Sequence, residues 1–404
     1  MRRPAAMPAP HRRAATVALM RAVQLVSSRA RVASVARSAV TTVAGLAVCV
    51  AVVGNVPAAS AAGGPAVLAT VTKQTAIAAG GGWVVWSSPD ASGHFDLVAS
   101  HHGIVATLPV QAQAQPFDAD VGTDAAGRVV ATFSRCRVPP VTSFDWVTRD
   151  GVACSARVVD LASGTERSAG IPRPKGASDT FPSMWAGRIA FARQDPRHKD
   201  VEQVLLWSLR TRRLTVLPHG VVPTSCPYRK ASDCVGQPVS GTVLGLDLGS
   251  RLVSFLWSVE APAVVGHGGY EVRTDRLSDR RSVLVGSGFL GEACTGGHDG
   301  VFPSPPVSQG ASVWYAQLTS TCYAYASTLE RYATSPRLAG VSGPLDGIVL
   351  QVARDGTDLY ALVAPPNLPD DEPTCDQPAR PCTIQRIATA ALTAVRRLPS
   401  APVF

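Results

Sequence analysis

The chain has 404 residues, of which 46% are apolar and 17% charged, with a formal net charge of +9. This length excludes a miniprotein held together mainly by disulfides, and the apolar share excludes a chain that is disordered throughout. Eight of the 38 basic residues and none of the 29 acidic ones precede position 62, so the remainder carries 30 basic against 29 acidic residues, a net charge of +1. We therefore expect no nucleic-acid partner.

Residues 1–61 have the pattern of a cleaved export signal. An arginine-bearing stretch leads into the apolar run Ala39 to Val53, and Ala59-Ser60-Ala61 has the A-x-A form of a signal peptidase site. The run is 15 residues long, whereas a spanning helix needs about 20. We expect secretion to the extracellular space or cell envelope, with residues 62–404 as the mature protein and no stable membrane span. Either Met1 or Met20 could be the true start of the chain.

Cys49 raises the alternative of a lipid anchor. Two features argue against it. Val48 stands where a lipidation site needs a small residue, and the apolar run continues past Cys49.

A six-fold repeat follows. In each unit a glycine turn precedes a run of β-branched and aromatic residues, which favour half-buried strands. The turns are Gly82, Gly127, Gly187, Gly249, Gly310 and Gly356, and the runs are Trp83 to Trp86, Val129 to Phe133, Ile189 to Phe191, Leu252 to Trp257, Val313 to Tyr315 and Leu359 to Val363.

A later strand and a short polar hairpin complete each unit. Tyr270-Glu271-Val272-Arg273 alternates, which predicts one face inward and one in water. Four strands repeated six times, without a convincing helix, predict an all-β fold, a six-bladed β-propeller of four antiparallel strands per blade. We place the blades at about 75–110, 117–171, 180–218, 240–285, 302–340 and 345–399. Ala66 to Thr72 could add a closing strand.

Two segments carry a family resemblance. Phe181-Pro182-Ser183-Met184-Trp185-Ala186-Gly187-Arg188-Ile189-Ala190-Phe191 resembles the blade repeat of TolB-like six-bladed propellers, and Val158 to Thr165 resembles its later half. The likeness spans positions 66 to 400 and is sharpest in blades two to four. Ala-Gly or Leu-Gly replaces the usual Ser-Pro-Asp-Gly turn, and no separate α/β domain is present. The resemblance implies the fold and none of TolB's partners.

Cysteine usage agrees with export. Without Cys49 the count is even, which in an exported chain indicates disulfides rather than metal sites. We predict sequential pairing of Cys136 with Cys154, Cys226 with Cys234, Cys294 with Cys322, and Cys375 with Cys382.

In a propeller, the connections between second and third strands and those between blades emerge on one face. Here they are long and contain or border all eight cysteines, so we expect disulfide-braced loops and binding on this long-loop face. An alternative is that the bridges serve only to resist proteolysis. Candidate ligand contacts are Phe144, Asp145, Trp146, Tyr228, Arg229, Lys230, His298, Asp299, Asp370, Asp371 and Glu372.

The chain lacks the G-x-S-x-G, H-E-x-x-H, Walker and dinucleotide-binding motifs. We therefore expect a secreted module that binds a small molecule, a glycan or an extracellular protein, with no catalytic residues, cofactor or metal. The alternative is a propeller hydrolase or lyase that uses carboxylates or a divalent metal at the channel mouth.

Overall fold

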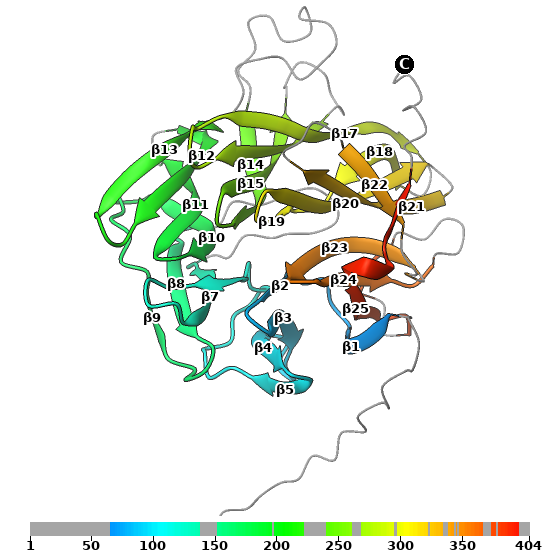
Figure 1. Ribbon diagram of the computed structural model, residues 1–404, viewed down its shortest axis with the longest axis horizontal. Coiled ribbons are helices and arrows are strands. Elements are labelled where there is room, and N and C mark those ends of the chain that lie inside the picture. The colour runs from blue at the N-terminus through cyan, green and yellow to red at the C-terminus, as the bar shows by residue number, and fades with distance from the viewer. Residues whose placement is uncertain are drawn as a thin grey trace, which may run out of the picture. The chain divides into compact units, whose positions relative to one another are not determined.

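A computed structural model describes residues 65–137, 152–195, 198–221, 240–260, 268–294, 297–321, 324–333, 338–342, 345, 347–366, 373–376 and 379–395. All of them belong to one compact unit, Ala58–Phe404, while a second unit, Met1–Pro57, lies outside the described residues. The predicted signal at 1–61 therefore stays a prediction. Within the described part the fold is all-β, and its one helical element is a short 3-10 turn (Figure 1).

Three of the sheets have four antiparallel strands each. The first contains β2 (Ile77–Gly80), β3 (Trp83–Pro89), β4 (Phe95–His101) and β5 (Ile104–Thr107), and the second β6 (Asp120–Thr123), β7 (Val129–Arg135), β8 (Ser155–Asp160) and β9 (Glu166–Ser168). The third contains β23 (Ile348–Asp355), β24 (Asp358–Ala364), β25 (Cys382–Ala388) and β1 (Ala66–Val71).

The remaining strands join in one continuous sheet. They are β10 (Ser178–Trp185), β11 (Arg188–Asp195), β12 (His198–Ser208), β13 (Arg213–Val221), β14 (Ser240–Leu248), β15 (Leu252–Glu260), β16 (Gly268–Arg276), β17 (Ser282–Cys294), β18 (Gly297–Pro303), β19 (Val307–Gln309), β20 (Ser312–Thr321), β21 (Ala324–Ala333), β22 (Leu338–Ser342) and β26 (Thr393–Val395), with the 3-10 turn η2 (Thr389–Ala391) before β26. A single parallel bridge links β12 to β14, and all other pairings in this sheet are antiparallel.

Five of the six predicted glycine turns, Gly82, Gly127, Gly187, Gly310 and Gly356, have positive φ, between 56° and 83°, a conformation that a side chain would disfavour. The sixth, Gly249, does not have positive φ, but its N–H donates to Leu252 O across the hairpin at 2.9 Å. The six predicted β runs that follow the turns all lie within strands, namely β3, β7, β11, β15, β20 and β24. The local sequence pattern is sufficient to predict these strands because the conformations of a turn and a strand depend mainly on neighbouring residues.

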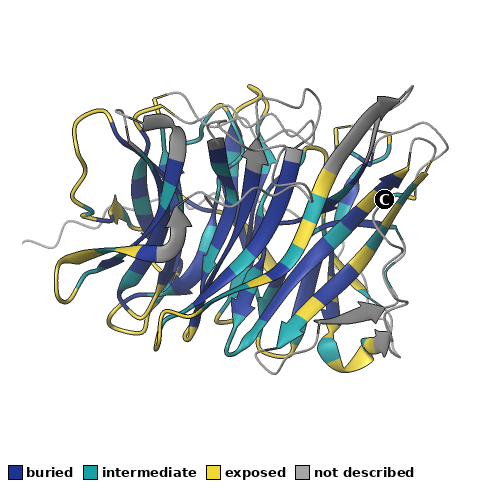
Figure 2. Cartoon of the chain, turned by 90° about the horizontal axis from the view of Figure 1, so that it is seen from above, coloured by how far each residue is buried: buried dark blue, intermediate teal, exposed yellow. Residues whose placement is uncertain are grey.

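We call β2, β6, β10, β14, β19 and β23 the first strands. They contact one another in this order, and β23 in turn contacts β2. Apolar clusters fill the space between consecutive sheets. In one of them Phe117 and Phe133 meet edge to face, with ring centroids 5.1 Å apart. Figure 2 shows buried residues running along the strands and exposed residues gathered at many of the hairpins. This arrangement of sheets is propeller-like.

The neighbouring sheets correct one expectation. The polar side of Tyr270 to Arg273 was predicted to face water, yet Glu271 is only 9% exposed and forms an ion pair of 2.7 Å with Arg273. Sheets packed side by side cover both faces of their inner strands, so polar positions there must find partners inside the protein.

At each step around the first strands, a side chain accepts a hydrogen bond from a backbone N–H that lies in, or just before, the next first strand. The acceptor and donor atoms are Ser87 Oγ and Phe117 N, Asp118 Oδ2 and Phe181 N, Ser183 Oγ and Leu248 N, Asp247 Oδ2 and Ser308 N, Ser327 Oγ and Val349 N, and Gln351 Oε1 and Ile77 N. We call these six contacts the junction bonds. They satisfy inner-strand donors that would otherwise be buried without partners.

The segment Ala66 to Thr72, suggested as a closing strand, forms the strand β1. β1 pairs antiparallel with β25, from Ala66 opposite Arg386 to Val71 opposite Cys382, and it covers the outer edge of the last sheet (Figure 1). The start of the described chain is thereby hydrogen-bonded to its end.

Two of the four predicted disulfides are confirmed, Cys136–Cys154 and Cys375–Cys382. The other two predictions concern Cys226, Cys234 and Cys322, which lie outside the described residues, and Cys294, whose side chain does as well. They stay predictions.

If β1 closes the fold, its inward side chain should matter more than its outward one. Val71 is 3% exposed and packs in a core cluster, whereas Val67 is 51% exposed. We expect Val71→Ala to lower the free energy of unfolding in urea by about 1 to 3 kcal/mol and the matched Val67→Ala by less than about 0.5 kcal/mol. Equal losses would show that β1 does not pack as described.

The junction bonds can be tested at Ser87. Its hydroxyl accepts the Phe117 N–H at 2.8 Å, and both residues are buried. Ser87→Ala leaves that N–H without an acceptor, which should lower the free energy of unfolding by about 1 to 3 kcal/mol. Ser88→Ala, on the opposite face of the same strand, is the control and should change it by less than about 0.5 kcal/mol. The prediction fails if Ser87→Ala is neutral in urea denaturation.

Candidate ligand-binding cavity

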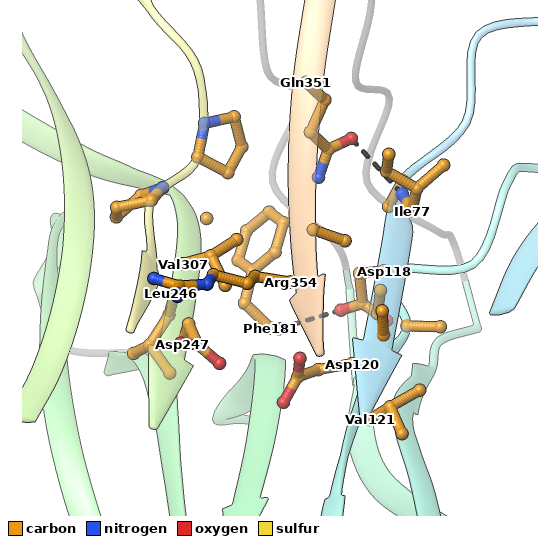
Figure 3. Close-up of a pocket in the computed structure, with 18 of the residues that line it drawn as sticks. Ile77, Asp118, Asp120, Val121, Phe181, Leu246, Asp247, Val307, Gln351 and Arg354 are labelled. Atoms are coloured by element: carbon orange, nitrogen blue, oxygen red, sulfur yellow. Dashed lines mark hydrogen bonds between the residues drawn. The ribbon is translucent and has the colours of Figure 1, made fainter. Parts of the chain in front are cut away.

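A cavity of about 380 Å³ lies among the first strands, and all six contribute to its wall (Figure 3). Most of the lining is apolar. The larger apolar side chains are Ile77, Val121, Phe181, Trp185, Leu244, Leu246, Val307 and Leu350. Among the polar lining residues are Asp118, Asp120, Asp247, Gln351, Arg354 and Asp355. A volume of this size and a mostly apolar wall with few polar groups are typical of small-molecule sites.

Three of the polar residues are already engaged. Both oxygens of Asp118 accept hydrogen bonds, from Phe181 N at 2.8 Å and from the backbone and hydroxyl of Ser134. Gln351 accepts from Ile77 N at 3.3 Å, and Asp355 accepts from Gly82 N at 2.6 Å. These side chains hold one sheet to the next, so we assign them to the wall rather than to ligand recognition.

Asp120 on β6 and Asp247 on β14 form an interacting carboxyl pair. Hydrogen bonding to the Ser183 hydroxyl of β10 lowers the pKa of each and so offsets part of the effect of burial. Burial raises the pKa of Asp247 to about 6, and burial followed by repulsion from Asp247 raises the pKa of Asp120 well above its ordinary value. Oδ2 of Asp120 is buried and has no hydrogen-bond partner within the described part of the chain. The pair therefore resists carrying two negative charges.

Arg354 on β23 is the cationic group of the wall (Figure 3). Its guanidinium carbon lies 4.8 Å from the centroid of the Trp314 ring, and Arg331 approaches the same ring at 5.2 Å. Burial, with a further contribution from the Arg331 charge, lowers the pKa of Arg354.

None of these cavity residues was among the sequence candidates. Phe144, Asp145, Trp146, Tyr228, Arg229, Lys230, Asp370, Asp371 and Glu372 lie outside the described residues. His298 and Asp299 belong to β18, but their side chains are likewise not described. A usable signal existed for Asp247, since aspartate is depleted in strands and Asp247 lies between two leucines just before Gly249.

Two further findings concern the described residues alone. No group of three or more His, Cys, Asp and Glu side chains is arranged so that it could hold a metal ion. No helix there has the length and apolar character needed to cross a membrane.

No family model matches the sequence, and no curated protein does either. The resemblance to TolB-like propellers therefore stays a prediction. The fold is similar to several solved structures at low identity. A puromycin hydrolase aligns with a TM-score of 0.41 and 12% identity, over 85% of this chain and 55% of that one. The chain thus spans about half the length of the puromycin hydrolases that it is similar to.

Two lyases align over more of their own length. A polysaccharide lyase of family PL25, an ulvan lyase, gives a TM-score of 0.41 and 10% identity over 83% of this chain and 85% of that one. An oligogalacturonate lyase from Vibrio parahaemolyticus gives a TM-score of 0.36 and 8% identity over 80% of this chain and 92% of that one. TM-scores this low assign no activity.

The carboxyl pair predicts an unusual pH dependence. Because the pKa of Asp247 is near 6 in the folded protein and near 3.8 when unfolded, the folded state binds more protons between these values. The contribution of the protonated Asp247 to the free energy of unfolding is therefore lost as pH rises from about 4 to 6. Asp247→Asn keeps an oxygen acceptor but cannot ionise. It should flatten this decline, raising the free energy of unfolding at pH 7 relative to the wild type by at most about 3 kcal/mol.

Urea denaturation from pH 4 to 7 measures the effect. Asp376→Asn, which removes a carboxyl whose side chain is 57% exposed, is the control and should leave the wild-type profile nearly unchanged. Parallel profiles for the wild type and Asp247→Asn would contradict the raised pKa.

Proposed function

We propose that this chain is an exported six-bladed β-propeller that binds a small, largely apolar molecule in the cavity among its first strands. The observation that carries the proposal is the cavity itself, with a mostly apolar wall built from all six first strands. A glycan or an extracellular protein, the other two partner classes, would be expected to prefer a more polar or a flatter surface.

Three observations support the six-bladed architecture. The first strands contact one another in a closed series, six junction bonds accompany that series, and the predicted six glycine turns each precede a strand. β1 would then close the ring by completing the sixth blade with a strand from the other end of the chain.

Export is supported by two kinds of evidence. Residues 1–61 have the composition and cleavage pattern of a signal, and the bridges Cys136–Cys154 and Cys375–Cys382 are typical of oxidising compartments. The balanced charge of residues 62–404 gives no electrostatic reason to expect nucleic acid as a partner.

A second function, hydrolysis or elimination on a bound substrate, is favoured by one observation. Asp120 and Asp247 line the same cavity, and their raised pKa values are of the kind that a general acid needs. If this function is correct, Asp120→Asn should abolish turnover while leaving binding of the substrate intact.

Binding can be measured with N-phenylnaphthylamine, a neutral apolar probe that fluoresces when removed from water. We expect one probe per chain. Val307→Trp places a larger ring in the cavity wall and should weaken binding at least about tenfold, because the volume available to the probe is reduced. Val105→Trp is the control, since Val105 is 49% exposed on β5 and does not line the cavity. Equal binding by both variants would place the probe elsewhere and contradict the proposal.

A further inference from the structure

Arg354 is a cation at the wall of the cavity, and within the described part of the chain no carboxylate forms an ion pair with it. Its Nε is buried and has no hydrogen-bond partner among the described residues. Another cation, Arg331, lies over the same Trp314 ring, and its charge lowers the pKa of Arg354. Neither the ring nor Arg331 can accept a hydrogen bond from the guanidinium in the way that an anion can.

Other largely buried arginines in this protein do meet carboxylates. Arg193 is bonded to both oxygens of Asp179, at 2.6 and 2.9 Å. Arg135 and Arg157 share Glu166, and Arg273 pairs with Glu271. These four described guanidinium groups all pair with carboxylates, as buried charges usually do. Arg354 lines the cavity and has no such pair among the described residues.

The carboxyl pair of the same cavity does not create an equal demand for a cationic ligand. Burial raises the pKa of both Asp120 and Asp247, so the pair can reduce its negative charge by taking up a proton more easily than exposed carboxyls can. An arginine cannot lose its charge in this way, since it stays protonated in proteins. The charge that most needs a partner from outside the protein is therefore positive.

We propose that the ligand of the cavity is an anion, a small molecule with an apolar body and a carboxylate that pairs with Arg354. The inference rests on the proposed binding function and adds the chemical class of the ligand. A planar carboxylate matches the fork of N–H donors that a guanidinium presents, and the apolar wall accommodates the rest of the molecule. Pairing would supply the carboxylate partner that the Arg354 guanidinium lacks within the described part of the chain.

Three probes with one apolar body and different head groups test this: naphthylacetate, naphthylacetamide and naphthylethylamine. Their dissociation constants are measured by calorimetry on the full mature chain at pH 7. We expect the carboxylate to bind at least about tenfold more tightly than the neutral amide, because a charge-assisted hydrogen bond replaces a neutral one. An amide or amine that binds as tightly as the carboxylate would overturn the inference.

Variants locate the preference. Arg354→Gln should make the carboxylate and the amide bind alike, and Arg354→Lys should retain part of the preference. Arg331→Gln is the matched control, because Arg331 lies over the same ring but is exposed and does not line the cavity. It should leave the preference intact. A preference that survives Arg354→Gln would contradict the assignment, and if that variant fails to fold, the wild-type series and Arg354→Lys still decide.

The two proposals can fail separately. If N-phenylnaphthylamine binds in the cavity but the three head groups bind equally, the binding function stands and the anionic class is wrong. If neither that probe nor any of the three binds, the proposed function fails, and the inference fails with it.

Discussion

The structure depends on one recurring contact, a side chain that accepts a hydrogen bond from the backbone of the next first strand. The first strands are buried among neighbouring sheets, where an N–H without an acceptor costs free energy comparable to a lost hydrogen bond. Within a sheet, the ladder satisfies only the edge that faces the second strand. The junction bonds serve part of the other edge, and they occur at every step from β2 to β23 and back.

This constraint also shapes the cavity. Acceptors such as Asp118, Asp247 and Gln351 must lie on or next to the first strands, so polar groups are found in an otherwise apolar wall. The acceptors that take part in the junction bonds belong to the scaffold. Asp120 Oδ2 and Arg354 Nε differ from them, since these two atoms are buried and have no partner in the described part of the chain. Unused polar groups beside an apolar cavity are what a bound molecule can recognise.

Asp120 and Arg354 respond differently to burial. Burial penalises both charges, but a carboxyl can bind a proton whereas a guanidinium cannot. The carboxyl pair of Asp120 and Asp247 can therefore reduce its charge by taking up a proton. Arg354 remains charged beside Arg331, with an aromatic ring as its main compensation. The difference in chemistry between the two groups decides which charge a ligand should carry.

The sequence by itself determined the strands and turns, because these depend on neighbouring residues. The glycine turns and the β runs after them lie where predicted, and the short spacings of Cys136–Cys154 and Cys375–Cys382 made these pairs predictable. Only the tertiary structure decided which polar residues meet. Asp120, Ser183 and Asp247 come from three different first strands, β6, β10 and β14, and Glu271 is buried although the alternation of its own strand predicts exposure. Contacts between distant segments depend on the packing of whole sheets, which no local pattern encodes.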